Sequence, residues 1–371
     1  MTHSLEMFYR GKTVAITGHT GFKGSWLATW LTHMGARVVG YALEPPSEPS
    51  HFECCRIDEH VAQHILGDVR DYEKLTTTFR TYRPDIVLHL AAQALVRPAY
   101  RDPRHTFEVN IMGTVNVLEA ARQCESVQGL VVVTSDKCYR NVGWEWSYRE
   151  SDQLGGHEAY STSKACAELV SAAYQDPAFQ HHSSPSTQLP VATARAGNAI
   201  GGGDWATDRI IPDIIRAVIG DQELVIRHPG ATRPWQHALE ALSGYLWLAK
   251  RLTEAPEQFA TAWNFGPHEE RMVTVEQILR KVIANWPAPK LKIKINGGRN
   301  DMEKLILGVD CSRAHHRLGW HAVWPVDTTL EATIDWYRAY YAGENMHAFT
   351  VKQIERYAQD AQQQNVAWAS V

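Results

Sequence analysis

The chain has 371 residues, of which 44% are hydrophobic and 21% are charged, a composition typical of a globular protein with one large or two modest domains. The 37 Lys and Arg against 41 Asp and Glu give a formal net charge of −4, so we expect no nucleic-acid partner, because there is no basic excess to neutralise phosphates. No apolar run reaches the ~18 residues that a membrane span needs, and residues 1–10 do not resemble a signal peptide. We therefore expect a cytoplasmic protein with no membrane partner.

The six cysteines form no CxxC pair, and in a cytosolic protein free thiols are the expected state. Cys54, Cys55, His60 and His64 lie close together in the sequence, but their spacing matches no closed structural zinc site. A solvated helix or loop that carries two histidines is the favoured interpretation, so we expect no metal.

The first half of the chain alternates strands and helices. Short apolar runs rich in Val and Ile predict strands at 12–17, 38–43, 62–67, 86–90, 130–134 and 191–195, because parallel strands buried on both faces carry such runs. Helical patterns lie between them at 25–33, 72–82, 106–123 and 161–174. This alternation predicts an α/β fold with a Rossmann-like, doubly wound parallel sheet.

The pattern loosens after Gly197, where glycines and prolines separate shorter elements. We expect a helix at 237–252 and a last strand at 261–265 to rejoin the sheet, and helices at 273–285 and 328–341 to lie in a smaller, mixed α/β lobe. Segment 181–187 is polar and predicts a surface insertion. The expected division is a Rossmann-type domain at 1–197, completed by 236–265, and a smaller C-terminal lobe at 198–235 and 266–371.

A glycine-rich turn is the strongest local motif. Gly18, Gly21 and Gly24 form a GxxGxxG pattern between the first predicted strand and the first helix. Glycines allow a tight turn and let the backbone approach a pyrophosphate, and the following helix N-terminus presents unpaired N–H groups to it. The strand before and the helix after the turn favour a dinucleotide site over a plain glycine-rich turn.

An acidic residue after the second strand often binds the adenosine ribose. Glu44 is the candidate here, although a simple loop role fits it equally well. No Lys or Arg lies between residues 38 and 55 to receive a 2′-phosphate, so NAD is favoured over NADP, with Lys23 as the residue that argues against this choice. Asp68, after the third strand, is a candidate acceptor for the adenine amine and is also a candidate N-cap of the helix at 72–82.

Tyr160 and Lys164 form a YxxxK pair on a predicted helix, where these positions share one face. The hydroxyl-bearing segment TSDK at 134–137 follows a predicted strand. A hydroxyl near a tyrosine with an ammonium behind it suits the removal of a proton from an alcohol. We expect Lys164 and a nicotinamide charge to lower the pKa of Tyr160 toward neutral pH.

These motifs resemble those of the extended short-chain dehydrogenase/reductase family, and the resemblance covers most of the chain. Further matching segments are LAAQ at 90–93, VNIMGT at 109–114 and RAGN at 195–198. The resemblance implies an NAD-binding Rossmann-type domain and a substrate-binding smaller lobe. The cofactor-binding residues that it implies are Gly18, His19, Thr20, Gly21, Phe22, Lys23, Gly24, Asp68, Val69, Ala91, Ala92, Gln93, Asn110, Tyr160 and Lys164.

Longer segments narrow the resemblance to sugar-nucleotide 4,6-dehydratases that act on CDP-D-glucose: TGHTGFKGSWL at 17–27, TSDKCY at 134–139, GGGDW at 201–205 and RPWQHALE at 233–240. The implied reaction removes water from CDP-glucose to give CDP-4-keto-6-deoxyglucose, the entry to dideoxysugars of bacterial surface polysaccharide such as lipopolysaccharide O-antigen. NAD takes a hydride from C4 and returns it to C6, so the implied chemistry needs no metal or second redox substrate.

The resemblance also implies the first catalytic residues. Tyr160, supported by Lys164, takes the proton of the C4 hydroxyl. Ser135 hydrogen-bonds the C4 oxygen, with Thr134 as the alternative, because the phase of the strand decides which hydroxyl faces the site.

Elimination of water needs an acid and a base besides Tyr160. Related dehydratases carry an Asp-Glu pair where this chain has Asp136 and Lys137. By that match Asp136 is the acid at C6, and burial should raise its pKa. Lys137 is the favoured base at C5, which requires desolvation and nearby positive charge. The alternative is that Lys137 stabilises the enolate, with water or Tyr160 as the base.

Arg233 is expected to clamp the substrate diphosphate in a bidentate way. Trp235 is a candidate near the nucleotide, although a large aromatic is more often part of a core. A homodimer or homotetramer is expected, because in this family two helices per subunit, here 106–123 and 161–174, form a four-helix interface. The rival interpretations are a sugar-nucleotide epimerase and a non-catalytic dinucleotide-binding sensor. The implied substrate-binding residues are Gln93, Arg97, Asn198, Arg209, Arg233 and Trp235.

Overall fold

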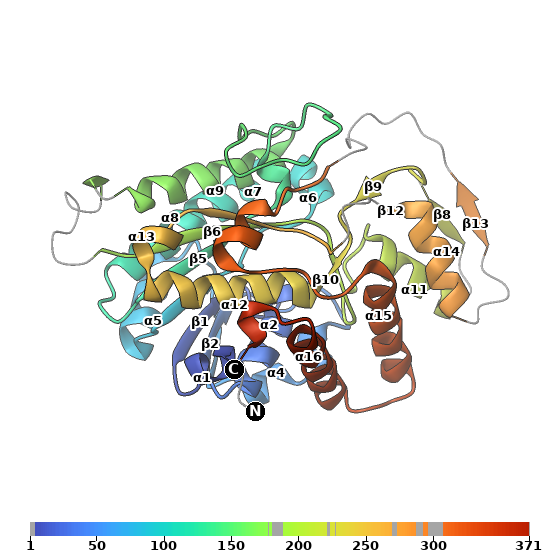
Figure 1. The fold of residues 1–371 in the computed structure, drawn as a ribbon, viewed down its shortest axis with the longest axis horizontal. Coiled ribbons are helices and arrows are strands. Elements are labelled where there is room, and N and C mark those ends of the chain that lie inside the picture. The colour runs from blue at the N-terminus through green and yellow to red at the C-terminus, as the bar shows by residue number, and fades with distance from the viewer. Residues whose placement is uncertain are drawn as a thin grey trace.

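The central element of the computed structural model is a seven-stranded parallel sheet in the order β11-β6-β5-β4-β1-β2-β3 (Figure 1). The structure describes residues 4–176, 178–179, 188–220, 223–226, 228–268, 273–286, 292–295 and 307–370. The predicted Rossmann-like, doubly wound sheet is confirmed, and each predicted strand bound lies within one residue of the observed one. The strands are β1 (Thr13–Thr17), β2 (Arg37–Ala42), β3 (Gln63–Leu66), β4 (Ile86–His89), β5 (Gly129–Val133), β6 (Val191–Ala196) and β11 (Ala262–Phe265).

The strand order reverses its direction at β1, which places the binding crevice. β1 pairs with β2 on one side and with β4 on the other, so that Thr17 lies opposite both Tyr41 and His89. In open parallel sheets, ligands bind beyond the carboxyl ends of the strands at such a switch point. The chain segments that follow β1, β4, β5 and β6 therefore converge on one edge of the sheet.

Alternating side chains of the strands fill two cores, one on each face of the sheet. Val14 and Ile16 belong to the core beneath α2 and α12, whereas Ala15 belongs to the core beneath α5 and α8. Burial on both faces explains the continuous apolar runs that predict these strands. The main helices around the sheet are α2 (Phe22–His33), α5 (Tyr72–Tyr82), α8 (Gly113–Arg122), α9 (Ala159–Gln175) and α12 (Ala238–Glu254).

The helix predicted at 106–123 is not continuous. The chain forms α7 (Pro103–Phe107), a π-helical turn η1 (Glu108–Met112) and then α8. Asp102 caps α7 by accepting a hydrogen bond from the N–H of His105 at 2.9 Å. The π-helical turn carries Asn110, one of the predicted cofactor-binding residues, and such turns frequently lie at functional sites. Periodicity alone does not distinguish a π-helical turn from regular α-helix.

The elements after β6 include a second group, drawn at the right of Figure 1. Segment 181–187, the predicted surface insertion, lies outside the described residues. The division into two domains stays a prediction. The group comprises α11 (Ile210–Gly220), β8 (Leu224–Ile226), β9 (Thr232–Arg233), β12 (Val273–Thr274), α14 (Val275–Asn285), β13 (Ile293–Ile295) and α15 (Val326–Tyr341).

The C-terminal helix α16 (Met346–Gln363) is not predicted from the sequence. It packs against α2, on the Rossmann-type part of the chain (Figure 1). Within the part of the chain that the structure describes, no helix has the length and apolar character to cross a bilayer. The remaining elements are α1 (Ser4–Tyr9), α3 (His51–Cys54), α4 (Ile57–His60), α6 (Val96–Arg101), η2 (Asp136–Cys138), β7 (Ala199–Ile200), β10 (Gln236–His237), α13 (Pro256–Phe259), η3 (Ala314–Leu318) and η4 (Ala367–Ala369).

Candidate active site

The glycine-rich turn joins β1 to α2 and depends on its glycines. Gly18 has φ +82°, and a Cβ there would lie 2.7 Å from the backbone N of Ala91. A Cβ on Gly24 would lie 2.0 Å from the carbonyl oxygen of Gly18, so the helix packs directly on the turn. Gly21 is the N-cap of α2 and supplies no side-chain cap. The first N–H groups of α2 are thus open to an anion, as a pyrophosphate site requires.

Side chains of the turn fasten it to the neighbouring strands. The Nε2 of His19 lies 2.7 Å from the Nδ1 of His64 on β3, and burial lowers the pKa of His19 to about 3, so its ring is neutral. The hydroxyl of Thr20 donates to the carbonyl of Leu43 at 2.9 Å. The Nδ1 of His64 is therefore engaged by His19. Among the described residues, no three His, Cys, Asp or Glu side chains are placed to hold a metal.

Lys23 lies in the turn, close to several of the candidate catalytic residues. Its Nζ lies 3.3 Å from the hydroxyl of Tyr245. Burial and the nearby charges of Lys164 and Arg209 lower the pKa of Lys23 to about 7, with Asp136 acting in the opposite direction. The resemblance groups Lys23 with the cofactor turn, and the structure adds its closeness to the groups expected to carry out the chemistry.

Asp68 and Val69 follow β3. The Asp68 carboxylate pairs with Arg70 at 2.6 Å, and this hydrogen bond lowers the pKa of Asp68. The alternative role of Asp68 as an N-cap is wrong, because Asp71 caps α5 by accepting from the N–H of Lys74. Val69 is buried, and a Cβ on Gly113 would lie 2.6 Å from its Cγ2.

The segment after β4 is braced by Asn110. Its amide oxygen accepts from the N–H of Gln93 at 2.8 Å, and its amide nitrogen donates to the carbonyl of Gln93 and to the hydroxyl of Ser163. The Gln93 side chain is itself bound to Leu95 and Thr106. In this structure, Asn110 and Gln93 therefore fix the path of residues 91–93 beside the glycine turn.

Tyr160 and Lys164 lie one turn apart near the start of α9 and are both buried. Burial raises the pKa of Tyr160 to about 12, whereas a hydrogen bond with Ser135 and the charge of Arg209 act to lower it. The Nζ of Lys164 donates to the carbonyl of Val133 at 3.2 Å. The chain's own groups therefore do not bring the pKa of Tyr160 near neutrality, and its lowering by Lys164 together with a nicotinamide charge stays a prediction.

The strand phase at the end of β5 distinguishes Ser135 from Thr134. The Thr134 hydroxyl donates to Glu168, whereas the Ser135 hydroxyl donates to Asp136 at 2.8 Å and acts to lower the pKa of Tyr160. Ser135 is thus the hydroxyl that faces the candidate catalytic groups.

Asp136 is the central carboxyl of the site and is 2% exposed. Its Oδ1 accepts from the Ser135 hydroxyl at 2.8 Å, and its Oδ2 has no hydrogen-bond partner among the described residues. As expected, burial raises the pKa of Asp136, although the charges of Lys137 and Arg233 oppose this. Lys137 is partly exposed, and its charge lies close to Asp136.

The predicted substrate-binding residues occupy different environments. Arg233 is buried near Asp136, and its guanidinium donates to the carbonyl of Thr232 at 2.7 Å. Arg209 pairs with Asp204 at 2.8 Å and lies near Tyr160. Arg233 and Arg209 thus bring positive charge close to Asp136 and Tyr160.

Three other candidates lie further out or are engaged. Arg97 forms an ion pair with Asp208 at 2.8 Å. Trp235 is 6% exposed, packs in the main core and donates to the carbonyl of Val273, which favours the core interpretation. Asn198 is half-buried, and its carbonyl accepts from the N–H of Gln236.

Sequence reasoning does not identify Glu168 as part of this site. Its carboxylate is buried on α9, paired with Arg195 at 2.7 Å. The available signal is its spacing, since Tyr160, Lys164 and Glu168 recur every four residues and so share a helix face. The burial of Arg195 within β6 has no comparable signal in its local sequence.

Comparisons with known proteins agree with this arrangement. A family model described as GDP-mannose 4,6 dehydratase matches residues 15–333. The CDP-glucose 4,6-dehydratase of Salmonella typhimurium is 45% identical over 350 residues, which cover 94% of this chain and 97% of that protein. A dTDP-glucose 4,6-dehydratase of Xanthomonas campestris is 24% identical over a match that covers 88% of this chain and 93% of that protein.

Solved structures of low identity share the fold. The dTDP-glucose 4,6-dehydratase of Streptomyces venezuelae, with NAD and TYD bound, gives a TM-score of 0.74 at 20% identity, covering 90% of this chain and 98% of that chain. A UDP-glucose-4-epimerase of Stenotrophomonas maltophila with bound NAD gives 0.75 at 22% identity, covering 90% and 99%.

Proposed function

The chain belongs to the GDP-mannose 4,6 dehydratase family, and on that premise we propose that it converts CDP-D-glucose to CDP-4-keto-6-deoxy-D-glucose and water. It is thus an NAD-dependent hydro-lyase. The choice of CDP-glucose rests on the Salmonella relative, which is 45% identical over nearly the whole of both chains. The proposed role is in the biosynthesis of dideoxysugars for surface polysaccharide, and the proposed location is the cytoplasm.

NAD fits the glycine turn. Gly18 and Gly24 leave room only for backbone, and the N-terminus of α2 has no side-chain cap, so the turn can approach a diphosphate closely. When bound, NAD supplies the redox chemistry, accepting a hydride from C4 of the hexose and returning it to C6. The residues that would hold it are those of the turn from Gly18 to Gly24, with Asp68, Val69, Ala91, Ala92, Gln93, Asn110, Tyr160 and Lys164.

One observation carries the choice of a dehydratase over an epimerase, namely the state of Asp136. Loss of the C6 hydroxyl needs a group that donates a proton to it, and an epimerase needs no such acid. Asp136 is buried, and one of its oxygens has no partner among the described residues. Burial raises its pKa, which favours the protonated form that a general acid requires.

The other residues divide the remaining proton transfers. Tyr160 takes the proton of the C4 hydroxyl, and the Ser135 hydroxyl, which acts to lower the pKa of Tyr160, hydrogen-bonds the C4 oxygen. The C4 ketone acidifies the proton on C5, which Lys137 removes, and C5 regains a proton when the hydride is returned to C6. In the alternative, the Lys137 charge stabilises the enolate while water or Tyr160 acts as the base. Arg233 and Arg209 offset the charge of the substrate diphosphate.

The deciding assay incubates the pure protein with NAD and CDP-glucose and measures the alkali-induced absorbance of a 4-keto-6-deoxy sugar. UDP-, GDP- and dTDP-glucose are run in parallel, because the base preference rests on similarity alone. Product from CDP-glucose supports the proposal. Absence of product from all four nucleotide sugars would show that the chain is not a dehydratase, and interconversion at C4 without loss of water would favour the epimerase.

We further propose a homodimer or homotetramer. Met112 on η1 and Leu169 on α9 are 52% and 60% exposed, and η1 packs against α9. An apolar hollow of about 530 Å³ adjoins Met112, Phe107 and Ile111. A second copy of this chain is the proposed occupant, through the four-helix packing expected from the family. Analytical ultracentrifugation of Leu169→Glu should give a smaller species than the wild type, and an unchanged mass contradicts the interface.

A further inference from the structure

Glu168 is a buried carboxylate on the same face of α9 as Tyr160 and Lys164. Its side chain is 2% exposed. One carboxylate oxygen accepts from the hydroxyl of Thr134, and the other accepts from the hydroxyl of Thr193 at 2.8 Å and from Arg195 at 2.7 Å. With three donors on two oxygens, the carboxylate has a single fixed orientation.

Glu168 supplies negative charge where positive charge is buried. Burial lowers the pKa of Lys164 to about 8, and Glu168 is the strongest of the influences that raise it. Burial keeps the Cys138 thiol neutral by raising its pKa, and it keeps the His89 ring neutral by lowering its pKa to about 3. The titratable groups that interact electrostatically with Lys164 are Glu168 of α9, Cys138 of η2, His89 of β4 and Lys23 of α2. Among these, Glu168 alone is negatively charged.

The partner of Glu168 is itself held from several sides. Arg195 is 4% exposed and donates to the hydroxyl of Tyr139 at 2.9 Å and to the carbonyl of Glu150 at 3.1 Å. The Tyr139 hydroxyl donates to the side chain of Asn264 at 2.7 Å. Tyr139 directly follows η2, the turn that carries the acid Asp136.

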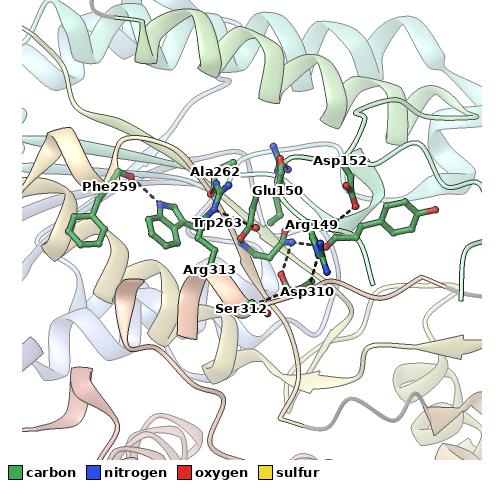
Figure 2. Close-up of polar contacts among 12 residues, drawn as sticks. Arg149, Glu150, Asp152, Phe259, Ala262, Trp263, Asp310, Ser312 and Arg313 are labelled. Carbon is green, nitrogen blue, oxygen red and sulfur yellow. Dashed lines mark hydrogen bonds and ion pairs between the residues drawn. The ribbon is translucent and has the colours of Figure 1, made fainter. Parts of the chain in front are cut away.

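The contacts extend to β11, a strand at the edge of the sheet. The Glu150 carboxylate accepts from the N–H of Asn264 at 2.9 Å and lies 3.7 Å from the guanidinium of Arg313. Figure 2 shows Glu150 beside Arg313, close to Ala262 and Trp263 of β11. The Arg195–Glu168 pair is therefore anchored to β6, β11 and the segment after η2.

We propose that Glu168, fixed by Arg195 one helical turn beyond Lys164 on the same face of α9, is a positioning residue for the dehydratase reaction, which keeps Lys164 charged. This inference rests on the proposed function. Glu168 does not touch substrate in this scheme and acts through Lys164. The rival explanation is a purely structural brace between α9, β5 and β6.

The test uses a variant that removes charge and one that removes only a hydrogen bond. Glu168→Gln keeps the side-chain shape and removes the charge, whereas Thr193→Val removes one hydrogen bond to Glu168 and leaves the charge. With NAD and CDP-glucose at saturation, kcat is measured against pH for both variants and the wild type. The inference assigns the alkaline limb of the wild-type profile to loss of the Lys164 proton.

The inference expects the alkaline limb of Glu168→Gln to move to lower pH by about one unit or more, the usual effect of removing a close opposite charge. The limb of Thr193→Val should coincide with that of the wild type, even if its melting temperature falls. Coincident limbs for Glu168→Gln and the wild type, or equal shifts in both variants, overturn the inference. If circular dichroism shows that Glu168→Gln is unfolded, Glu168→Asp replaces it and should shift the limb less, in the same direction.

A direct titration separates this inference from the proposed function. Lysine labelled with ¹³C at the ε-carbon is titrated by NMR, and the Lys164 signal is identified by its absence in Lys164→Met. The Lys164 pKa should be lower in Glu168→Gln than in the wild type, and an equal pKa overturns the inference. If the wild type does not dehydrate CDP-glucose, the proposed function fails while this titration still reports on the pair.

Discussion

The substitution Asp136→Asn tests whether the Asp136 carboxyl donates a proton, because it removes the acidic proton and keeps the shape of the side chain. In Asp136→Asn, the amide oxygen can keep the hydrogen bond from Ser135, and the NH₂ group takes the place of an oxygen that has no partner among the described residues. Leaving that buried group unsatisfied should cost about 1–2 kcal/mol, against ordinary stabilities of about 5–15 kcal/mol. The variant should therefore fold.

The amide cannot donate a proton to the departing hydroxyl at C6. Loss of a general acid lowers rates by about 10²–10⁴-fold, or ~3–5 kcal/mol in the barrier. Formation of the 4-keto-6-deoxy product should fall by that factor. Proton removal from the C4 hydroxyl by Tyr160 does not need Asp136, so reduced NAD should still form in a single turnover.

The matched control is Asp85→Asn. Asp85 accepts from the N–H of Thr13 at 2.8 Å, at the opposite edge of the sheet from the site, and its variant should turn over like the wild type. Dehydration by Asp136→Asn within tenfold of the wild-type rate would refute the role of Asp136 as the acid.

Three further predictions concern other groups. Tyr160→Phe removes the proton acceptor, so both reduced NAD and product should fall by about 10²–10⁴-fold, and a single-turnover absorbance assay that detects normal reduction of NAD contradicts its role. Gly24→Ala places a Cβ 2.0 Å from the carbonyl oxygen of Gly18, so calorimetry should show a lower melting temperature that NAD no longer raises. Gly230→Ala, with nothing within 4 Å of the new Cβ, should behave as the wild type. Burial raises the pKa of Glu240 from 4.5 to about 7. Because the folded pKa is the higher one, the carboxyl costs nothing below pH 4.5, and the folded state loses about 3 kcal/mol as pH rises to 7. Urea unfolding should show this loss in the wild type relative to Glu240→Gln, and a difference between them that does not change with pH contradicts it.

The sheet was predictable from the sequence because its strands are buried on both faces and so carry uninterrupted apolar runs. The glycine turn was predictable because Gly18 and Gly24 leave no room for a side chain. The π-helical turn at Glu108–Met112 was not predictable, since its apolar spacing matches that of an ordinary helix.

The electrostatics of the site were the least predictable part. The resemblance implied that Asp136 has a raised pKa, and burial of Asp136 does raise it. Lys164 and a nicotinamide charge were expected to lower the pKa of Tyr160, whereas burial of the phenol within the chain raises it to about 12. Burial depends on chain segments far away in the sequence, so spacing alone cannot give its magnitude.

Positively charged side chains surround the Asp136 carboxyl. Burial and the nearby charges of Lys164 and Arg209 lower the pKa of Lys23, and burial lowers the pKa of Lys164. Arg233 lies close to Asp136. Such crowding destabilises the folded chain, and a sequence selected for stability alone would not retain it. The two ligands proposed for this crevice each carry a diphosphate, and their negative charge offsets the repulsion among the cations. The same cations that lower the stability of the free chain therefore favour the binding of two diphosphates. The hydrophobic cores on both faces of the sheet offset this loss of stability.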